Sequence, residues 1–552
     1  MHARVTVTTF ERGPVGDEPG RPKGHSLDVG RAVGGAALIL TLGNLSGSVL
    51  GFIRQAVIGA AFGANHRTDA FYAASIVPQM FYDLTIGAAI SAALIPTFTE
   101  IVERDGRDAL WRLLGNVLAI AWLVLLAVVV ALLLVARPFV SLLVIGVQPS
   151  ARGVEESLIV ELVRLLVPTL FFLGTSAIFL STLYSLRRFA VPAFAPGLYH
   201  LGIIAGALGL ARSFGIVALP IGALAGSAAQ AVVQAGAVLR LRPTMRIRPT
   251  LTPEVRRILR LYLPVAAGLI VSIVGQIIDV QFKLHLRAGG LVAMQFATTY
   301  TQFPIGIAVA ALSFAVLPTL SSHAAFHRPQ EFKKTLALGI RFVLFLTLPA
   351  AAGYIALGSP IIALLNQHGQ FHASDTQHAA TALAGYAIQI PFVGVDQLLI
   401  FAFYARRNTV TPMLVGVLGV CVYVVSAFIL LPRLQILGLA LANTLQNSLH
   451  ALILLVILVG AIGGLGARDI LPSVGRSLAA TAVMWIAAWG ALSGVGGVLT
   501  THNGPAFRLV DVALPMCAAV IAYLGSHAVL RSQELNLLVS LLRERGPALR
   551  KR

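Results

Sequence analysis

Apolar stretches separated by short polar segments recur along almost the whole of this 552-residue chain. Most are long enough for a helix to cross the roughly 30 Å hydrocarbon core of a bilayer, which takes about 20 residues. The stretches are continuous, as at 117–135 and 413–431, whereas the strands of a membrane barrel alternate apolar and polar residues. The pattern predicts about fourteen transmembrane helices, at 32–60, 70–98, 110–136, 158–184, 191–211, 215–239, 258–282, 291–320, 337–365, 377–404, 410–431, 436–462, 472–497 and 508–530.

The composition agrees with a membrane protein and excludes a soluble fold. Hydrophobic residues make up 57% of the chain and charged residues 11%, whereas soluble domains contain about 25% charged residues. The two cysteines, Cys421 and Cys517, lie in separate apolar stretches, so neither a disulfide framework nor a cysteine-based zinc site is predicted. The expected fold class is an all-α polytopic membrane protein.

The formal net charge of +19 follows a membrane topology rather than a nucleic-acid surface. With the N-terminus in the cytoplasm, roughly 31 of the 41 Lys and Arg residues fall in cytoplasmic segments, as the positive-inside rule requires. Both termini are therefore expected in the cytoplasm. The arginine-rich segment at 240–260 and the basic end of the chain at 550–552 are expected to bind anionic lipid headgroups. Nucleic acid is not an expected partner.

Two sequence matches indicate an internal duplication. The segment SAALIPT at 91–97 resembles SFAVLPT at 313–319, and the segment from Tyr to Pro at 184–192 resembles the one at 404–412, including an Arg-Arg pair in each. Six predicted helices separate the matched segments. Because six is even, the two copies share one orientation, which predicts two parallel-repeated six-helix bundles followed by two additional helices.

The predicted organisation follows from this repeat and from the polar segments between helices. It comprises a disordered cytoplasmic tail at 1–30, an N-terminal six-helix bundle at 31–240, a basic cytoplasmic linker at 241–257, a C-terminal six-helix bundle at 258–462, two additional transmembrane helices at 463–531 and a basic cytoplasmic tail at 532–552. The first segment has no apolar core beside a cleavage site, so it is not read as a signal peptide. The small-residue patterns G-x-x-x-G at 202–206 and 222–226 predict close helix packing.

Several short motifs resemble one family of transporters over roughly residues 35–460. They are VLGFIR at 49–54, FGA at 62–64, TDAF at 68–71, FPIG at 303–306, LPTLS at 317–321, FYAR at 403–406 and TP at 411–412. Together they resemble the MurJ/MviN family of lipid II flippases, within the superfamily of multidrug and toxin extruders and polysaccharide flippases. The resemblance implies a V-shaped pair of bundles, alternating access, and export of undecaprenyl-pyrophosphate-linked muropeptide. It also implies that the last two helices form a groove for the polyprenyl tail, with cell-wall synthesis proteins as partners.

The chain departs from the family at the positions that usually carry charge in the cavity. Ser48 and Gln55 replace an Arg and an acid, Phe81, Tyr82 and Ile86 replace an Arg pair and an acid, and Thr298, Thr299 and Gln302 replace an Asp-Arg pair and a Glu. The exact substrate is therefore open. The alternatives are a cation-coupled exporter of another polyprenyl-linked glycan or of drugs, and a transport-inactive paralogue that scaffolds cell-wall synthesis.

Charged residues within or beside the apolar stretches are the candidate functional residues, because a charge in a membrane helix is costly unless it faces a cavity or a partner. Arg is the preferred bidentate partner of a phosphate, so Arg54 is the predicted pyrophosphate contact, although pairing with Asp69 or Asp83 or an outer interfacial position is the alternative. The predicted substrate-binding residues are Arg54, Asp69, Asp83, Lys283 and Arg287; the predicted ion-coupling residues are Asp279 and Asp396; the predicted gate residues are Arg187, Arg188, Arg406 and Arg407.

No enzyme motif is present, since the chain has no Walker A sequence, no H-E-x-x-H and no nucleophile elbow. The chain is therefore expected to be a transporter rather than an enzyme, driven by an ion gradient or the membrane potential. No cofactor is expected beyond a coupling monovalent cation, sodium or a proton. His368 and His372 are four residues apart, but Gly369 between them indicates a loop, so no metal site is predicted.

Overall fold

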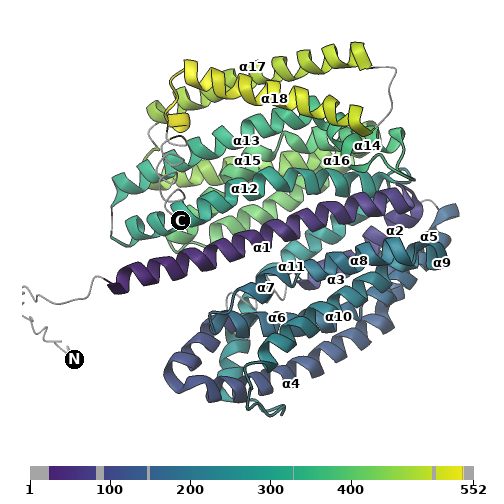
Figure 1. Cartoon of the computed structure of the whole chain (residues 1–552), viewed down its shortest axis with the longest axis vertical. Helices are drawn as coiled ribbons and strands as arrows, with labels where there is room; N and C mark the ends of the chain where they lie inside the picture. The colour runs from purple at the N-terminus through teal and green to yellow at the C-terminus, as the bar shows by residue number, and fades with distance from the viewer. Residues whose placement is uncertain are drawn as a thin grey trace, which may run out of the picture.

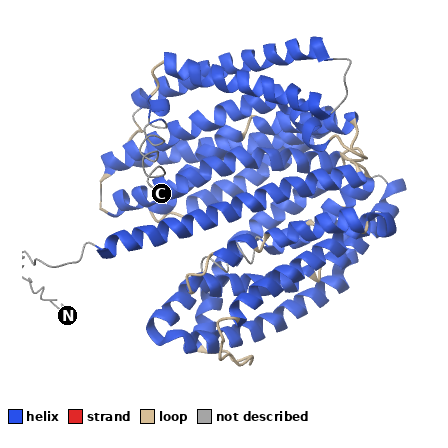
Figure 2. Ribbon diagram, viewed as in Figure 1, coloured by secondary structure: helices blue, strands red, loops and turns tan. Residues whose placement is uncertain are grey.

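The structure is a computed structural model that describes residues 24–82, 93–145, 149–326, 328–465, 467–499, 505–536 and 539. The described residues are helical with short turns and contain no strand (Figures 1 and 2). This confirms the predicted all-α class. The helices of the first half are α1 (Gly24–Phe62), α2 (His66–Ala74), α3 (Ile76–Tyr82), α4 (Ile95–Leu143), α5 (Pro149–Leu166), α6 (Thr169–Ser185), α7 (Ala190–Phe194), α8 (Gly197–Gly209), α9 (Ala211–Phe214) and α10 (Ala218–Leu239).

The second half begins after the basic linker. Its helices are α11 (Pro253–Leu284), α12 (Gly290–Ala325), α13 (Pro329–Asn366), α14 (Ala373–Ala387), α15 (Ile390–Ala405), α16 (Val410–Ile462), α17 (Ala467–Leu499) and α18 (Pro505–Val529). Among the described residues, nine helical segments are long and apolar enough to cross a membrane, or ten when the bent pair α14 and α15 counts as one span. The chain is thus a multi-pass membrane protein, and the total of fourteen stays a prediction.

Two helices are longer than one membrane crossing. Helix α16 spans 53 residues, and a break at Gln435, where φ is 50°, divides it into two helical segments. The break lies between the predicted helices at 410–431 and 436–462, so α16 holds both of them. Helix α4 has 49 residues and a similar break at Gly106, where φ is 82°.

The internal duplication is visible in the backbone. Arg187 and Arg407 both adopt the left-handed conformation, with φ of 57° and 58°. Gly215 and Gln435 also match, with φ of 57° and 50° and ψ of −138° and −124°. A positive φ is uncommon for residues other than glycine, so the recurrence of two such turns at a spacing of 220 residues supports the predicted repeat.

The two halves form two bundles on either side of α1 (Figure 1). Below, the end that carries the turns at Arg187 and Arg407 is called the inner end, and the opposite end the outer end. One apolar cluster mixes residues of both halves, such as Phe71 and Phe296. Two further clusters lie toward the inner end. The one around Trp111 consists of first-half residues together with Val255 and Ile258 at the start of α11, and the one around Phe332 consists of second-half residues. The bundles therefore share a core at the outer end, and at the inner end only the start of α11 packs with the first half.

Two predicted helix contacts are present, one at the small-residue patterns of the N-terminal bundle and one between the two additional helices and the C-terminal bundle. A Cβ atom on Gly202 would lie 2.3 Å from the Gly222 carbonyl oxygen, so α8 and α10 approach as closely as the G-x-x-x-G patterns predict. Helices α17 and α18 pack on α13, where the Tyr523 hydroxyl donates to the Phe345 carbonyl oxygen at 2.7 Å. The two additional helices are thus attached to the C-terminal bundle.

Candidate functional site

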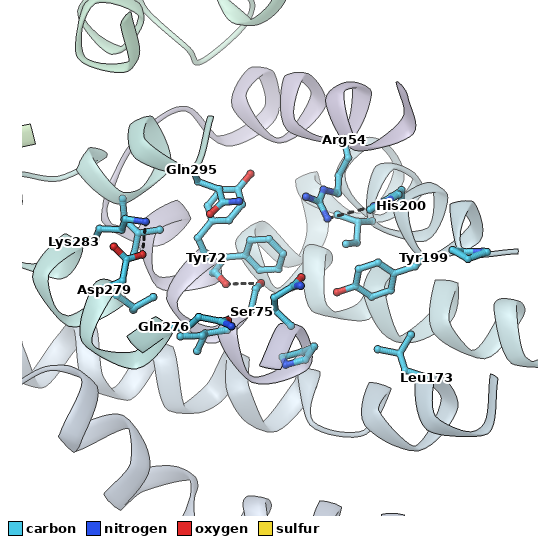
Figure 3. Close-up of a pocket in the computed structure, with 18 of the residues that line it drawn as sticks. Arg54, Tyr72, Ser75, Leu173, Tyr199, His200, Gln276, Asp279, Lys283 and Gln295 are labelled. Atoms are coloured by element: carbon cyan, nitrogen blue, oxygen red, sulfur yellow. Dashed lines mark hydrogen bonds and ion pairs between the residues drawn. The ribbon is translucent and has the colours of Figure 1, made fainter. Parts of the chain in front are cut away.

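A cavity of ≈ 410 Å³ lies between the two bundles. Its walls come from α1, α2, α3, α6, α8 and α10 of the first half and from α11 and α12 of the second half. In Figure 3, Arg54 and His200 lie on one side of this cavity, and Asp279 and Lys283 lie on the opposite side. The structure therefore brings together Arg54, Asp279 and Lys283, which the sequence identified separately.

Arg54 on α1 is an incompletely satisfied cation. One of its Nη atoms lies 3.3 Å from Nδ1 of His200, and because arginine carries only donors, His200 must accept. Its Nε atom is buried without a hydrogen-bond partner. None of the ion pairs among the described residues involves Arg54, so no carboxylate there lies within 4 Å of its guanidinium. A charge so placed in a membrane protein favours an anionic ligand.

Lys283 on α11 is also buried, but its charge is balanced. Its ammonium lies 2.6 Å from Oδ2 of Asp279, and the Tyr423 hydroxyl donates to the other carboxylate oxygen at 2.7 Å. The two carboxylate oxygens are thus bonded to a neighbour on α11 and to one on α16. Arg54 is therefore the source of net positive charge among the described cavity residues, and Lys283 is a second cation that an anion is able to recruit.

Several polar residues of the cavity wall escaped the sequence analysis. They are Tyr72, Ser75, Tyr199, His200, Gln230 and Gln295. The signal that identifies most of them is a hydrogen-bonding side chain inside an apolar helix. His200 in α8 is the clearest case, since that helix is otherwise apolar. Such residues supply donors and acceptors without adding charge to the cavity.

Three predicted substrate contacts lie elsewhere or are not described. Asp69 is buried outside the cavity, where its two carboxylate oxygens accept hydrogen bonds from the backbone N–H groups of Gly289 at 2.6 Å and Val292 at 2.9 Å. It therefore caps the start of α12 and joins the two halves at the outer end. Arg287 is exposed in the turn before α12. Asp83 lies outside the described residues.

A second contact closes the outer end between the halves. The Gln370 backbone N–H donates to the Ala60 carbonyl oxygen at 2.9 Å. Beside it, Gly369 has φ of 56°, and a Cβ atom there would lie 2.2 Å from the same oxygen. Only glycine fits at this position, because both the conformation and the close approach exclude a side chain. Together with Asp69, this contact keeps the bundles joined at the outer end.

Two of the departures from the family pattern contact each other. Gln55 on α1 donates through Nε2 to Oγ1 of Thr299 on α12 at 2.6 Å, and it also reaches the Gln295 carbonyl oxygen at 3.3 Å. At these positions the family resemblance implies an acid and an Arg. A neutral hydrogen bond between the halves therefore occupies the place of a charged pair.

The remaining predicted residues lie away from the cavity. Asp396 on α15 pairs with His450 on α16, with Oδ1 and Nδ1 2.7 Å apart. The four predicted gate residues are exposed at the inner-end turns, where Arg187 lies 3.9 Å from Glu103. The arrangement at 187–188 and at 406–407 is the same in both halves, which fits either membrane anchoring or gating.

His368 and His372 have local roles at helix ends. His368 bonds to the Leu364 carbonyl oxygen at 3.0 Å, and His372 caps α14 together with Asp375. Within the described residues, no group of three or more His, Cys, Asp or Glu side chains is arranged to hold a metal ion.

Comparison with known proteins places the chain in a family. The family described as "Lipid II flippase MurJ" matches residues 58–503. The chain belongs to this family. A probable lipid II flippase MurJ of Rhizobium tropici is 30% identical over 506 residues, which cover 89% of this chain and 93% of the relative. A lipid II flippase MurJ of Burkholderia cenocepacia is 27% identical and covers 74% of this chain and 80% of the relative.

Solved structures agree with the fold. A lipid II flippase MurJ in an inward closed conformation superposes with a TM-score of 0.72 at 21% identity, covering 90% of this chain and all of that one. An inward-facing multidrug resistance transporter of the MATE family gives a TM-score of 0.65 at 12% identity, covering 77% of this chain and 99% of that one. The fold class predicted from the sequence is therefore confirmed.

Proposed function

We propose that the chain is a flippase that moves lipid II, the undecaprenyl-pyrophosphate-linked peptidoglycan precursor, from the inner to the outer leaflet of the bacterial cytoplasmic membrane by alternating access. The observation that carries this proposal is Arg54, a cation without a carboxylate partner among the described residues, in a cavity between two duplicated bundles. Membership of the lipid II flippase family supports the choice of substrate.

The cavity chemistry suits a pyrophosphate. The Arg54 guanidinium offers unused donors, and arginine binds phosphate oxygens through two parallel hydrogen bonds. On the opposite wall, the Lys283 ammonium is able to exchange its Asp279 partner for a phosphate oxygen, while Tyr423 continues to donate to the carboxylate. Two cations from opposite bundles would thus contact one substrate. Such a contact gives the ligand a way to bias the bundles toward one arrangement.

The orientation of the chain follows from charge. The excess of Lys and Arg at the inner end supports an inner end in the cytoplasm, with both termini there and anionic headgroups beside the basic linker. In this orientation the outer contacts at Asp69 and Gly369 close the cavity toward the outside. Cell-wall synthesis proteins are proposed partners on chemical grounds, because they supply and consume the substrate. Sodium or a proton is the proposed coupling ion.

Complementation tests the proposal. A bacterium depleted of its own lipid II flippase receives the intact chain, the variant Arg54→Ala, the variant Arg54→Lys or the control Arg67→Ala at matched membrane levels. Arg67 is exposed on α2 outside the cavity. We expect the intact chain and Arg67→Ala to restore growth, Arg54→Ala to fail and Arg54→Lys to restore it in part, because lysine keeps the charge but not the two parallel hydrogen bonds.

The outcomes separate the possible functions. Rescue by Arg54→Ala equal to that of the intact chain would remove the proposed role of the cavity cation. Failure of a well-expressed intact chain would favour another lipid-linked glycan or a scaffolding role. Damage by Asp279→Asn or Asp396→Asn together with an unaffected Arg54→Ala would instead favour a cation-coupled exporter of a different substrate.

A further inference from the structure

The duplication places two equivalent polar pairs inside the two bundles. In the N-terminal bundle, Gln230 on α10 donates to the Ser176 hydroxyl on α6 at 2.8 Å. The positions 220 residues later hold Asp396 on α15 and His450 on α16, with Oδ1 and Nδ1 2.7 Å apart. The first pair is neutral at every pH, whereas both members of the second pair titrate. One copy of the repeat therefore carries an ionisable pair where the other carries a fixed hydrogen bond.

The geometry of the second pair indicates how many protons it holds. Nε2 of His450 lies 3.3 Å from the Pro412 carbonyl oxygen, which can only accept, so this nitrogen carries a hydrogen. At 2.7 Å, Nδ1 and the carboxylate oxygen of Asp396 must have a proton between them, because two bare acceptors would repel. The pair thus holds one shared proton and is neutral overall. Loss of the shared proton would leave a net negative charge in an apolar bundle.

The pair is largely buried inside the C-terminal bundle. Asp396 precedes the turn at Arg406 by ten residues of helix, about 15 Å, and its side chain is 13% exposed. Helices α11, α12, α13 and α14 pack against α15 and α16. Their charged and titratable residues are Glu254, Arg256, Arg257, Arg260, Tyr262, Asp279, Lys283, Tyr300, His323, Glu331, Lys333, Lys334, Arg341, Tyr354, Asp375, His378 and Tyr386. Among the described residues, none of these forms a hydrogen bond or ion pair with Asp396 or His450.

We propose that Asp396 and His450 form a proton-binding site through which a proton gradient drives the transport cycle. The proposal rests on the proposed flippase function and names its coupling ion. A proton enters from one side of the membrane, is shared between the Asp396 carboxylate and the His450 imidazole, and leaves to the other side, so no other reactant is consumed. Release changes the His450 bond to Pro412, which stands at the start of α16 beside the inner turn that carries Arg406 and Arg407. Proton loading is thereby linked to the position of this turn.

The duplication supplies the decisive variant. The double substitution Asp396→Ser with His450→Gln copies the N-terminal pair and keeps a hydrogen bond without an ionisable group. Full-length protein is reconstituted with lipid II in vesicles, with the membrane potential held at zero and a pH difference of about one unit. We expect the outer-to-inner ratio of lipid II to shift by up to about tenfold per coupled proton for the unmodified chain. For the double variant we expect flipping to a ratio near unity.

A second measurement detects protonation of Asp396 directly, without transport. Infrared difference spectra between about pH 5 and about pH 9, a range that spans histidine titration, should contain a carboxyl signal that disappears in Asp396→Asn. Absence of that signal in the unmodified chain, or equal gradient responses of the unmodified chain and the double variant, would overturn the proton site. If the unmodified chain shows the infrared signal but moves no lipid II, the flippase function fails and the proton site stands.

Discussion

Asp69 offers the sharpest test of the outer closure. Its carboxylate accepts two backbone N–H groups of α12, at 2.6 and 2.9 Å, in a buried position between the two halves. In Asp69→Asn, one carboxylate oxygen becomes an amide NH2 group, a donor that cannot accept a hydrogen bond from the backbone N–H group it faces. The variant therefore removes one charge-assisted hydrogen bond, leaves a donor unpaired, and removes the negative charge at the start of α12.

The size of the effect follows from these losses. A hydrogen bond to a charged group contributes about 1.5–3 kcal/mol, and a charge at a helix N-terminus about 0.3–1 kcal/mol. The outer-closed arrangement should lose about 2–4 kcal/mol relative to an outer-open one, because water replaces these bonds only when the contact opens. At about 1.4 kcal/mol for each factor of ten, the equilibrium shifts about 30- to 700-fold toward the outer-open state.

Cysteine accessibility measures that shift. Ser75 lines the cavity on the first-half side, so a Ser75→Cys reporter in a chain whose two native cysteines are replaced by serine reacts with a membrane-impermeant thiol reagent only when the outer end opens. We expect Asp69→Asn to accelerate labelling from outside until the open state dominates. Asp105→Asn is the control, because that carboxylate is exposed and bonds to Arg104. Unchanged labelling of a folded Asp69→Asn protein would refute the proposed closure.

Three further predictions concern other contacts. Lys283→Gln should leave the Asp279 carboxylate without its ion pair. We expect the free energy of unfolding in detergent to fall by about 3 kcal/mol, which a lower melting temperature would show. Gly369→Ala should weaken the outer contact and raise labelling of the same cysteine reporter, whereas alanine at an ordinary helical position should not. Burial opposes ionisation of Glu534, but hydrogen bonds from Ser473 and Arg341 outweigh it and lower its pKa. The ion pair of Glu534 should therefore stabilise the chain at neutral pH and be lost as the pH falls through the lowered pKa, which thermal melting across acidic pH values and its absence in Glu534→Gln would show.

The fold was predictable because it depends on features that are local or periodic in sequence. Apolar length sets the membrane helices, and the repeated segments at 91–97 and 313–319 set the duplication. The short polar segments between apolar stretches also placed the break at Gln435 between two predicted helices, at 410–431 and 436–462. They likewise placed the break at Gly106 between the predicted helices at 70–98 and 110–136.

The site was predictable only in part, because a charge in an apolar stretch reveals a cost but not the partner that offsets it. Arg54 and Lys283 were found on that ground, and both line the cavity. Asp69 has the same sequence signature but caps a helix 220 residues away, a role that only the tertiary arrangement reveals. His200 was missed because a single neutral histidine in an apolar helix gives a weak signal.

The missing family charges and the cavity charge are connected through one contact. The resemblance implies an acid at position 55 and an Arg at position 299, whose charges cancel, and the chain has a neutral hydrogen bond between Gln55 and Thr299 in their place. Exchanging a balanced pair for a neutral one changes the net charge of this contact by zero. Arg54, one residue away, keeps its own charge and remains the cation of the cavity that attracts an anion. A cavity with fewer charged groups thus retains the feature that pyrophosphate binding requires, which is an excess of positive charge rather than a large number of charges.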